Sequence, residues 1–272
     1  MDTRRLRAIA AIAYLVLMLP GCALLGPDTG DEKVEQSIGT CDPAPCIRVA
    51  IDPVPTLPEG LSPELKALIT TDVRGVLFAP LEADEAQQDD DVLMKELKAR
   101  YEEFAYGGFS DAPIEWELTR TATVLYQNPD VISIDIHNEG YVGGAHGFAD
   151  RTLLTYDVKR GKRLAIADLV DPNSEGIFHR VVEAQFRRAR EIPANESLSQ
   201  AGYFVTPGEP ILVPENFAIT PGGLVLQYNP YEIAPWSYGP TEIVVPLEAF
   251  EGVLKSDVKS LTATINEGAK KA

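Results

Sequence analysis

Histidine and cysteine are both scarce in this 272-residue chain, with three residues of each. The histidines show neither His-Glu-x-x-His nor His-x-x-x-His spacing, which argues against a zinc peptidase and a metal-dependent deacetylase. The chain also lacks a Gly-x-Ser-x-Gly elbow and a glycine-rich loop followed by Lys-Ser/Thr, so neither a serine hydrolase nor a phosphate-binding loop is indicated. We therefore expect a protein that is not an enzyme and that needs no metal and no cofactor.

Basic residues are also few, with 24 Lys and Arg against 41 Asp and Glu and a net charge of −17. Residues 1–21 hold three of the bases and one acid, so the remaining 251 residues carry 21 bases and 40 acids, a charge of −19. This excess of acid disfavours nucleic acid and anionic lipid as direct partners, because both need clustered Lys and Arg. It is typical of a soluble protein or of one that attracts a cationic partner.

Long apolar runs are absent apart from Ala8–Leu19, which follows Arg4, Arg5 and Arg7. This run is shorter than the roughly 20 apolar residues that span a bilayer, and its flanks are typical of a secretory signal over residues 1–21. The signal places the protein outside the cytoplasm.

The end of the signal resembles a bacterial lipobox, since it reads Leu-Pro-Gly followed by Cys22, with Pro20 where Ala or Ser is more usual. The resemblance implies cleavage before Cys22, lipid attachment to it and anchoring in the bacterial envelope. Because Ala23 follows rather than Asp, the anchor would lie at the periplasmic face of the outer membrane in a Gram-negative host. A plain signal that happens to end beside a cysteine is the alternative.

Residues 22–45 are rich in glycine, proline and acid, which predicts a flexible tether behind the lipidated cysteine. Cys41 and Cys46 stand five positions apart at its end. In an oxidising compartment we expect them to form a disulfide. A metal pair is the alternative, but no second Cys/His pair completes a tetrahedral site.

The folded part is predicted over residues 46–254, in two linked subdomains over 46–150 and 151–254, with a polar tail over 255–272. Helices are predicted from the Ser62-Pro63 start signal, from the acidic stretch Asp89–Asp91, over residues 177–186 and after Pro246. The three acids indicate solvated charge at a helix start rather than a cation site. Strands are predicted over residues 47–51, 114–126, 131–137, 152–158, 213–219, 224–228 and 242–245. Separate runs of helices and strands predict an α+β fold of antiparallel sheets with helices packed on one face.

The strand over residues 131–137 alternates strictly, with Ile132, Ile134 and Ile136 on one side. Ser133, Asp135 and His137 occupy the other side. This alternation predicts a hairpin strand with its polar face toward solvent.

Four glycines fall within residues 138–147, a stretch that also carries Tyr141 and His146. Glycines such as Gly143 and Gly144 allow a backbone with positive φ. Tyr141 and His146 could form a recognition or acid–base pair on this loop. Alternatively, the stretch is a tight connection between two strands, in which His146 only holds the backbone.

A second conspicuous stretch, residues 227–240, is rich in aromatic residues, among them Tyr231, Trp236 and Tyr238. These side chains could form a ridge that binds a protein or a sugar. They could equally close the end of the sheet.

Both stretches carry a family resemblance. Residues 141–147, followed by Thr155-Tyr-Asp157 and Gly161, resemble the Gly-Gly-Ala-His-bearing module of RsiV-type anti-sigma factors. Residues 216–224, 228–235 and 239–246 resemble its carboxy-terminal half. The same module occurs beside the catalytic domain of PdaC-type polysaccharide deacetylases, and residues 46–150 correspond to its PdaC-like part. The resemblance implies a two-part α+β extracytoplasmic domain, which in RsiV-type proteins binds lysozyme as a sensor.

Two departures limit what the resemblance implies. We find neither a cytoplasmic sigma-binding segment ahead of a transmembrane helix nor a deacetylase domain, so neither activity is expected here. The leading hypothesis is a non-enzymatic envelope lipoprotein that binds a cationic, lysozyme-like protein or a cell-wall glycan. The alternatives are an enzyme acting on peptidoglycan or another glycan through His146 and a carboxylate, and a structural envelope protein.

Overall fold

The structure is a computed structural model that describes residues 32–39, 41, 46–81, 90–106, 115–256 and 258. The predicted signal peptide, Cys22, the side chains of Asp89–Asp91 and nearly all of the predicted polar tail lie outside the described residues. None of the described helices is both long and apolar enough to cross a membrane.

The first sheet, here called the large sheet, has six strands in sequence order. They are β1 (Val34–Gly39), β2 (Cys46–Ile51), β3 (Glu115–Gln127), β4 (Val131–Tyr141), β5 (Phe148–Asp157) and β6 (Lys162–Arg163). Neighbouring strands are antiparallel except β2 and β3, which run parallel. The expectation of purely antiparallel pairing was wrong for this pair, because the helical segment between the two strands carries the chain back across the sheet.

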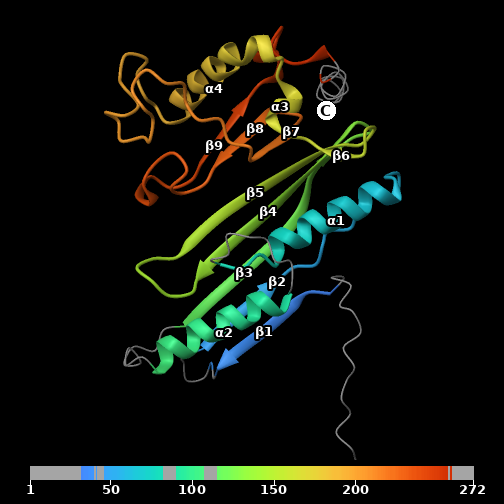
Figure 1. Ribbon diagram of the computed structural model, residues 1–272, viewed down its shortest axis with the longest axis vertical. Helices are drawn as coiled ribbons and strands as arrows, with labels where there is room; N and C mark the ends of the chain where they lie inside the picture. Colours follow the sequence, from blue (N-terminus) through green and yellow to red (C-terminus); the bar gives the residue numbers. More distant parts are fainter. Residues whose placement is uncertain are drawn as a thin grey trace, which may run out of the picture.

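Helices α1 (Pro63–Leu77) and α2 (Asp90–Tyr106) cover one face of the large sheet (Figure 1). As the sequence predicts, Ser62 caps α1, since its side chain accepts a hydrogen bond of 3.2 Å from the Leu65 amide. The buried face of α1 consists of Leu65, Ile69, Val73 and Leu77. It shares one hydrophobic core with the isoleucines of β4, which confirms the helical periodicity.

The small sheet has three antiparallel strands, β7 (Phe217–Thr220), β8 (Gly223–Tyr228) and β9 (Thr241–Val245). The remaining helices are α3 (Ile166–Leu169), α4 (Glu175–Ala189) and the short 3₁₀ turns η1 (Pro172–Ser174), η2 (Trp236–Tyr238) and η3 (Leu247–Phe250). Helix α4 packs on the small sheet through Phe178, Val182 and Phe186. The strand predicted from residue 213 begins only at Phe217, after Pro214, which has no amide hydrogen for a sheet ladder.

The two sheets pack against each other, with β7 lying across β4 and β5 (Figure 1). The Ser133 hydroxyl donates to the Ile219 carbonyl at 3.0 Å, and the Thr155 hydroxyl donates to the Phe217 carbonyl at 3.0 Å. Ser133 is 0% exposed and Asp135 is 6% exposed. The prediction that the polar face of β4 meets solvent was therefore wrong for these two residues, because the small sheet covers them; His137 is exposed, as predicted.

Two boundaries differ from those predicted. Strand β1 lies inside the segment assigned to a flexible tether, because Val34 and Ile38 pack on the core beneath the large sheet. The predicted disulfide between Cys41 and Cys46 is present, with the two Cα atoms 4.9 Å apart, and it joins the ends of β1 and β2. The predicted subdomain boundary at residue 150 falls inside β5. The part of the chain that forms the large sheet ends only after β6.

Candidate functional site

The two stretches that stand out in the sequence meet in space. The β4–β5 loop (residues 142–147) and the β8–β9 loop (residues 229–240) both lie at the left of Figure 1. The His146 ring stacks on the Trp236 ring, with centroids 4.2 Å apart and planes at 22°. It also lies 6.5 Å from the Tyr231 ring, at 30°. We call His146, Tyr231 and Trp236 the aromatic ridge, which joins a loop of the large sheet to a loop of the small sheet.

Tyr141, Gly143 and Gly144 shape the loop beneath His146. The Tyr141 hydroxyl donates to the Gly144 carbonyl at 3.0 Å, and its ring meets the buried Trp116 ring edge-on at 6.5 Å. Gly143 and Gly144 both have positive φ, of 97° and 87°. A Cβ on Gly143 would lie 3.0 Å from the Trp116 ring, so this position also needs a residue without a side chain. These three residues therefore determine the shape of the loop that carries His146.

The ring nitrogens of His146 are both engaged within the ridge. Its Nδ1 lies 2.8 Å from the Gly147 carbonyl, which can only accept, so Nδ1 carries a hydrogen. Its Nε2 lies 3.3 Å from the Tyr231 hydroxyl, which can donate to it. Among the residues that the structure describes, no group of three or more His, Cys, Asp or Glu side chains is placed to hold a metal ion. The two contacts of the ring nitrogens fix the orientation of the imidazole between the two loops.

Tyr231 is displayed at a conformational cost. Its φ of 70° lies in the left-handed region, which a bulky residue rarely adopts, and its side chain is 60% exposed. A compact turn holds it there, because the Tyr231 amide donates to the Ala234 carbonyl at 3.1 Å and the Glu232 amide to the Asn229 carbonyl at 3.1 Å. Such backbone strain costs about 1–3 kcal/mol and concentrates at functional sites. The exposed Tyr231 at a strained position is therefore a candidate for a binding role.

Tyr238 does not join the ridge. Its ring packs edge-on against Tyr203 at 5.4 Å, and its hydroxyl donates to the Ala201 carbonyl at 3.1 Å. Arg190 donates to the Tyr238 carbonyl at 3.0 Å. Tyr238 thus fastens the β8–β9 loop to the segment that follows α4, although 38% of it remains exposed.

Phe204 is a further exposed aromatic residue beside the β8–β9 loop, and it was missed in the sequence. Its amide donates to the Ile233 carbonyl at 2.8 Å, which ties it to the β8–β9 loop, and it is 57% exposed. The available signal was an aromatic residue in a stretch of turn-forming residues between Gly202 and Gly208. Periodicity could not reveal it, because the segment has no regular secondary structure.

Carboxylates lie on both sides of the ridge. A hollow of about 430 Å³ beside the β4–β5 loop is lined by Glu117 and Glu139 together with Tyr141. Asp150, at the start of β5, has its pKa raised by burial. Glu232, next to Tyr231, has its pKa raised by burial and further by repulsion from Asp150. The ridge therefore stands in an acidic environment.

The raised pKa of Asp150 predicts that Asp150→Asn increases thermal stability at neutral pH but not at acidic pH. The folded state favours the protonated Asp150 carboxyl, so this group contributes its full stability below the ordinary Asp pKa of about 4. That contribution is lost as pH rises through the raised folded-state pKa. We expect Asp150→Asn to raise the Tm at pH 7 by about 1–2 °C and to have no effect near pH 3.5, as measured by calorimetry. The exposed control Glu248→Gln should change the Tm at neither pH. A lower Tm of Asp150→Asn at pH 7 would contradict the prediction.

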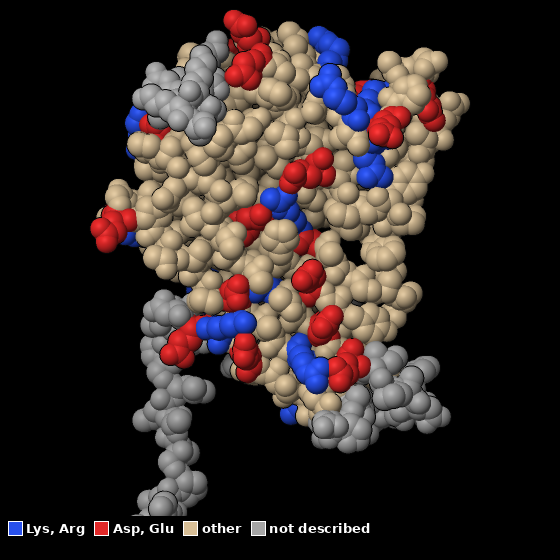
Figure 2. Space-filling view, turned by 180° about the vertical axis from the view of Figure 1, so that it is seen from behind, with Lys and Arg blue, Asp and Glu red and all other residues tan. Residues whose placement is uncertain are grey.

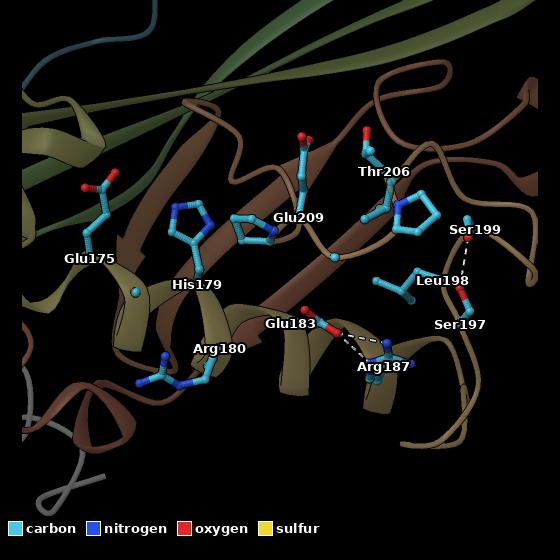
Figure 3. Close-up of a pocket in the computed structure, with 15 residues that line it drawn as sticks. Glu175, His179, Arg180, Glu183, Arg187, Ser197, Leu198, Ser199, Thr206 and Glu209 are labelled. Atoms are coloured by element: carbon cyan, nitrogen blue, oxygen red, sulfur yellow. Dashed lines mark hydrogen bonds and ion pairs between the residues drawn. The ribbon is translucent and has the colours of Figure 1, made fainter.

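A second hollow lies away from the ridge, between α4 and the segment 197–210 (Figure 3). It has a volume of about 650 Å³, and its lining includes Glu175, His179, Glu183, Arg187 and Glu209. None of the ridge residues lines it. The sequence offered no motif for this groove, because its two walls come from a helix and an irregular segment.

Comparisons with known proteins identify the carboxy-terminal part. Residues 167–248 match the model of a family described as "Protein of unknown function (DUF3298)". The match includes α4, the small sheet and the β8–β9 loop. No curated protein matches the chain.

Two solved structures share the fold. A DUF3298 family member from Bacteroides fragilis is 21% identical, with a TM-score of 0.64 over 87% of this chain and 96% of its own. A DUF3298 family protein from Pseudomonas aeruginosa is 18% identical, with a TM-score of 0.57 over 83% of this chain and 94% of its own. At these identities the likeness shows a common fold, and function has to be argued from the residues of the site.

Proposed function

We propose that this protein is a non-enzymatic, exported lipoprotein, anchored through Cys22, whose folded part binds a cationic, lysozyme-like protein. The aromatic ridge is the observation that carries the proposal. Two loops from different sheets place three rings side by side, with Tyr231 60% and Trp236 40% exposed. Exposed tryptophan and tyrosine on a rigid support are typical of binding hot spots.

The charge around the ridge favours a basic partner. The chain has a net charge of −17, and Glu117, Glu139, Asp150 and Glu232 lie near the two loops. Figure 2 shows acidic side chains in small groups, interleaved with basic ones, on the far side of the molecule from Figure 1. At the ridge, the rings would supply local affinity, because Lys and Arg side chains pack on Trp and Tyr faces. Long-range attraction would chiefly speed the encounter. The resemblance to the lysozyme-binding module of RsiV-type proteins supports the same partner.

Substitution of Trp236 tests the ridge directly. We expect the protein to bind hen lysozyme in isothermal titration calorimetry at 50 mM salt, with weaker binding at 300 mM. Trp236→Ala should lower the affinity about tenfold or more, since it removes the ring on which His146 stacks. Leu125→Ala, at an exposed apolar residue of β3, is the control and should bind like the wild type. No lysozyme binding at 50 mM salt would overturn this ligand, and unchanged affinity of Trp236→Ala would overturn the ridge as its contact surface.

A cell-wall glycan is the second candidate, because the exposed faces of Tyr231 and Trp236 can also pack on sugar rings. Sedimentation with purified peptidoglycan separates the two ligands. Retention of the wild type but not of Trp236→Ala, without lysozyme binding, would assign the ridge to glycan. On the non-enzymatic role, incubation with muropeptides should leave them unchanged. Cleaved or deacetylated products would overturn the non-enzymatic role.

A further inference from the structure

We propose that the groove along α4 is a second binding surface, which takes an extended peptide segment of a partner protein rich in Lys and Arg. The groove is separate from the aromatic ridge, so the inference goes beyond the proposed function. Its evidence is the shape of the groove, the rigidity of its walls, the free backbone amides along one wall and the charge that it presents.

The groove is long enough for several peptide residues. The hollow of about 650 Å³ adjoins a second hollow of about 410 Å³; both are lined by Glu175 and His179, and the hydrogen bond from His179 to Ile211 lies between them. The second hollow lies toward Ile166 and Val170. Figure 3 shows Glu175, His179, Glu183 and Arg187 following one another along α4, with Glu209 and Thr206 on the opposite wall. Preformed clefts of this size are typical of ligand sites.

Both walls are held in place by hydrogen bonds. His179 donates from Nδ1 to the Ile211 carbonyl at 2.9 Å, which fixes the irregular wall to α4. The Tyr228 hydroxyl donates to the Leu212 carbonyl at 2.7 Å from the core beneath. At the far end, Arg187 donates to the carbonyls of Pro193 and Glu196 at 3.2 and 2.8 Å. A ligand would therefore bind without first ordering the groove, which lowers the entropic cost of binding.

The wall at residues 212–213 offers main-chain donors. Within the described part of the chain, the amides of Leu212 and Val213 donate to no protein acceptor. Ile211 is fully buried, whereas Leu212 is 57% exposed beside the groove. An extended peptide can pair with such a free backbone while its apolar side chains contact Leu212. Pro210 and Pro214 flank the segment and cannot donate, so the pairing would stay short.

The free charge in the groove is negative. Glu183 is paired with Arg187 at 2.8 Å, so these two side chains neutralise each other. Glu175 and Glu209 form no ion pair with any residue that the structure describes. Arg180 also lines the first hollow and forms no ion pair with any residue that the structure describes, so the unpaired side chains of this hollow carry two negative charges and one positive charge. Lys or Arg side chains of the bound segment would complement the two free carboxylates.

The test uses two fluorescein-labelled synthetic peptides, Lys-Leu-Lys-Val-Lys-Leu and its counterpart with Glu at each Lys position. Fluorescence anisotropy should show binding of the basic peptide to the protein and at least tenfold weaker binding of the acidic one. The double variant Glu175→Lys/Glu209→Lys should lower affinity for the basic peptide at least tenfold. Glu248→Lys, an exposed charge reversal outside the groove, is the matched control and should leave it nearly unchanged.

Amide chemical shifts locate the peptide independently of charge. Titration into the ¹⁵N-labelled protein should move the Leu212 and Val213 signals most, and Trp236→Ala should leave this response intact. Equal binding of both peptides, equal loss in the control, or shifts confined to the ridge would overturn the groove as the binding surface. A dimer that the double variant dissociates would assign the groove to a second copy of the chain and would also overturn the proposal. If the protein bound the basic peptide in the groove but did not bind lysozyme, the proposal for the ridge would be refuted and the proposal for the groove would be unaffected.

Discussion

Replacement of Arg151 by methionine is expected to lower the free energy of unfolding by about 3–5 kcal/mol. Arg151 donates from Nε and Nη2 to the two carboxylate oxygens of Asp135, each at 2.8 Å, and also pairs with Glu242 on β9. Asp135 is 6% exposed, so loss of the guanidinium would leave its carboxylate buried with only His137, whose Nε2 lies 3.2 Å from its Oδ1, as an ionisable partner. The same change would remove a polar link between the large sheet and the small sheet.

Urea unfolding followed by circular dichroism measures this loss. Arg163→Met, at an exposed arginine on the neighbouring strand β6, is the matched control and should cost only a few tenths of a kcal/mol. The double variant Asp135→Leu/Arg151→Met should recover much of the stability, because it removes the buried carboxylate along with its partner. A cost below about 1 kcal/mol for Arg151→Met would show that Asp135 is compensated in another way.

Phe178→Ala is the second change with a large expected effect, a loss of about 3–5 kcal/mol from the core under α4. Phe178 is 1% exposed, and its ring stacks on Phe250 at 5.0 Å. Truncation would leave a cavity between α4 and the small sheet, because the walls are held by their own strands and helix. Ile177→Ala, at the neighbouring residue that is 45% exposed, should cost much less.

This variant also tests whether the two cores unfold together. Trp116 is buried in the core of the large sheet, whereas Trp236 lies on the β8–β9 loop. The hydrogen bonds from Ser133 and Thr155 across the sheets predict one transition, with both tryptophans changing at the same urea concentration. Two separate transitions in single-tryptophan proteins, made with Trp116→Phe or Trp236→Phe, would show that the cores unfold independently. A loss below about 1 kcal/mol for Phe178→Ala would contradict its role in the core.

The secondary structure was predictable wherever one local pattern sufficed. Ser62 and Pro63 mark the start of α1, and the apolar spacing after them identifies its buried face. The alternation in β4 likewise identifies a strand with two different faces. It does not reveal what covers each face, so Ser133 was placed in solvent although the small sheet buries it. Strand β1 was missed because two apolar residues in an acidic segment are too weak a signal without the core on which they pack.

The sequence by itself determined the components of the candidate site. The glycines around residue 143 predict a loop, and residues 227–240 stand out for their aromatic side chains, which could form a binding ridge or close the end of the sheet. Only the tertiary structure decided that His146 stacks on Trp236, which lies 90 positions further along the chain. It also decided that Phe204 is tied to the β8–β9 loop, that Tyr238 holds this loop to the segment after α4, and that α4 forms a groove with residues 205–210. The reason is that local patterns report the conformation of a segment, whereas contacts between distant loops depend on how the two sheets pack.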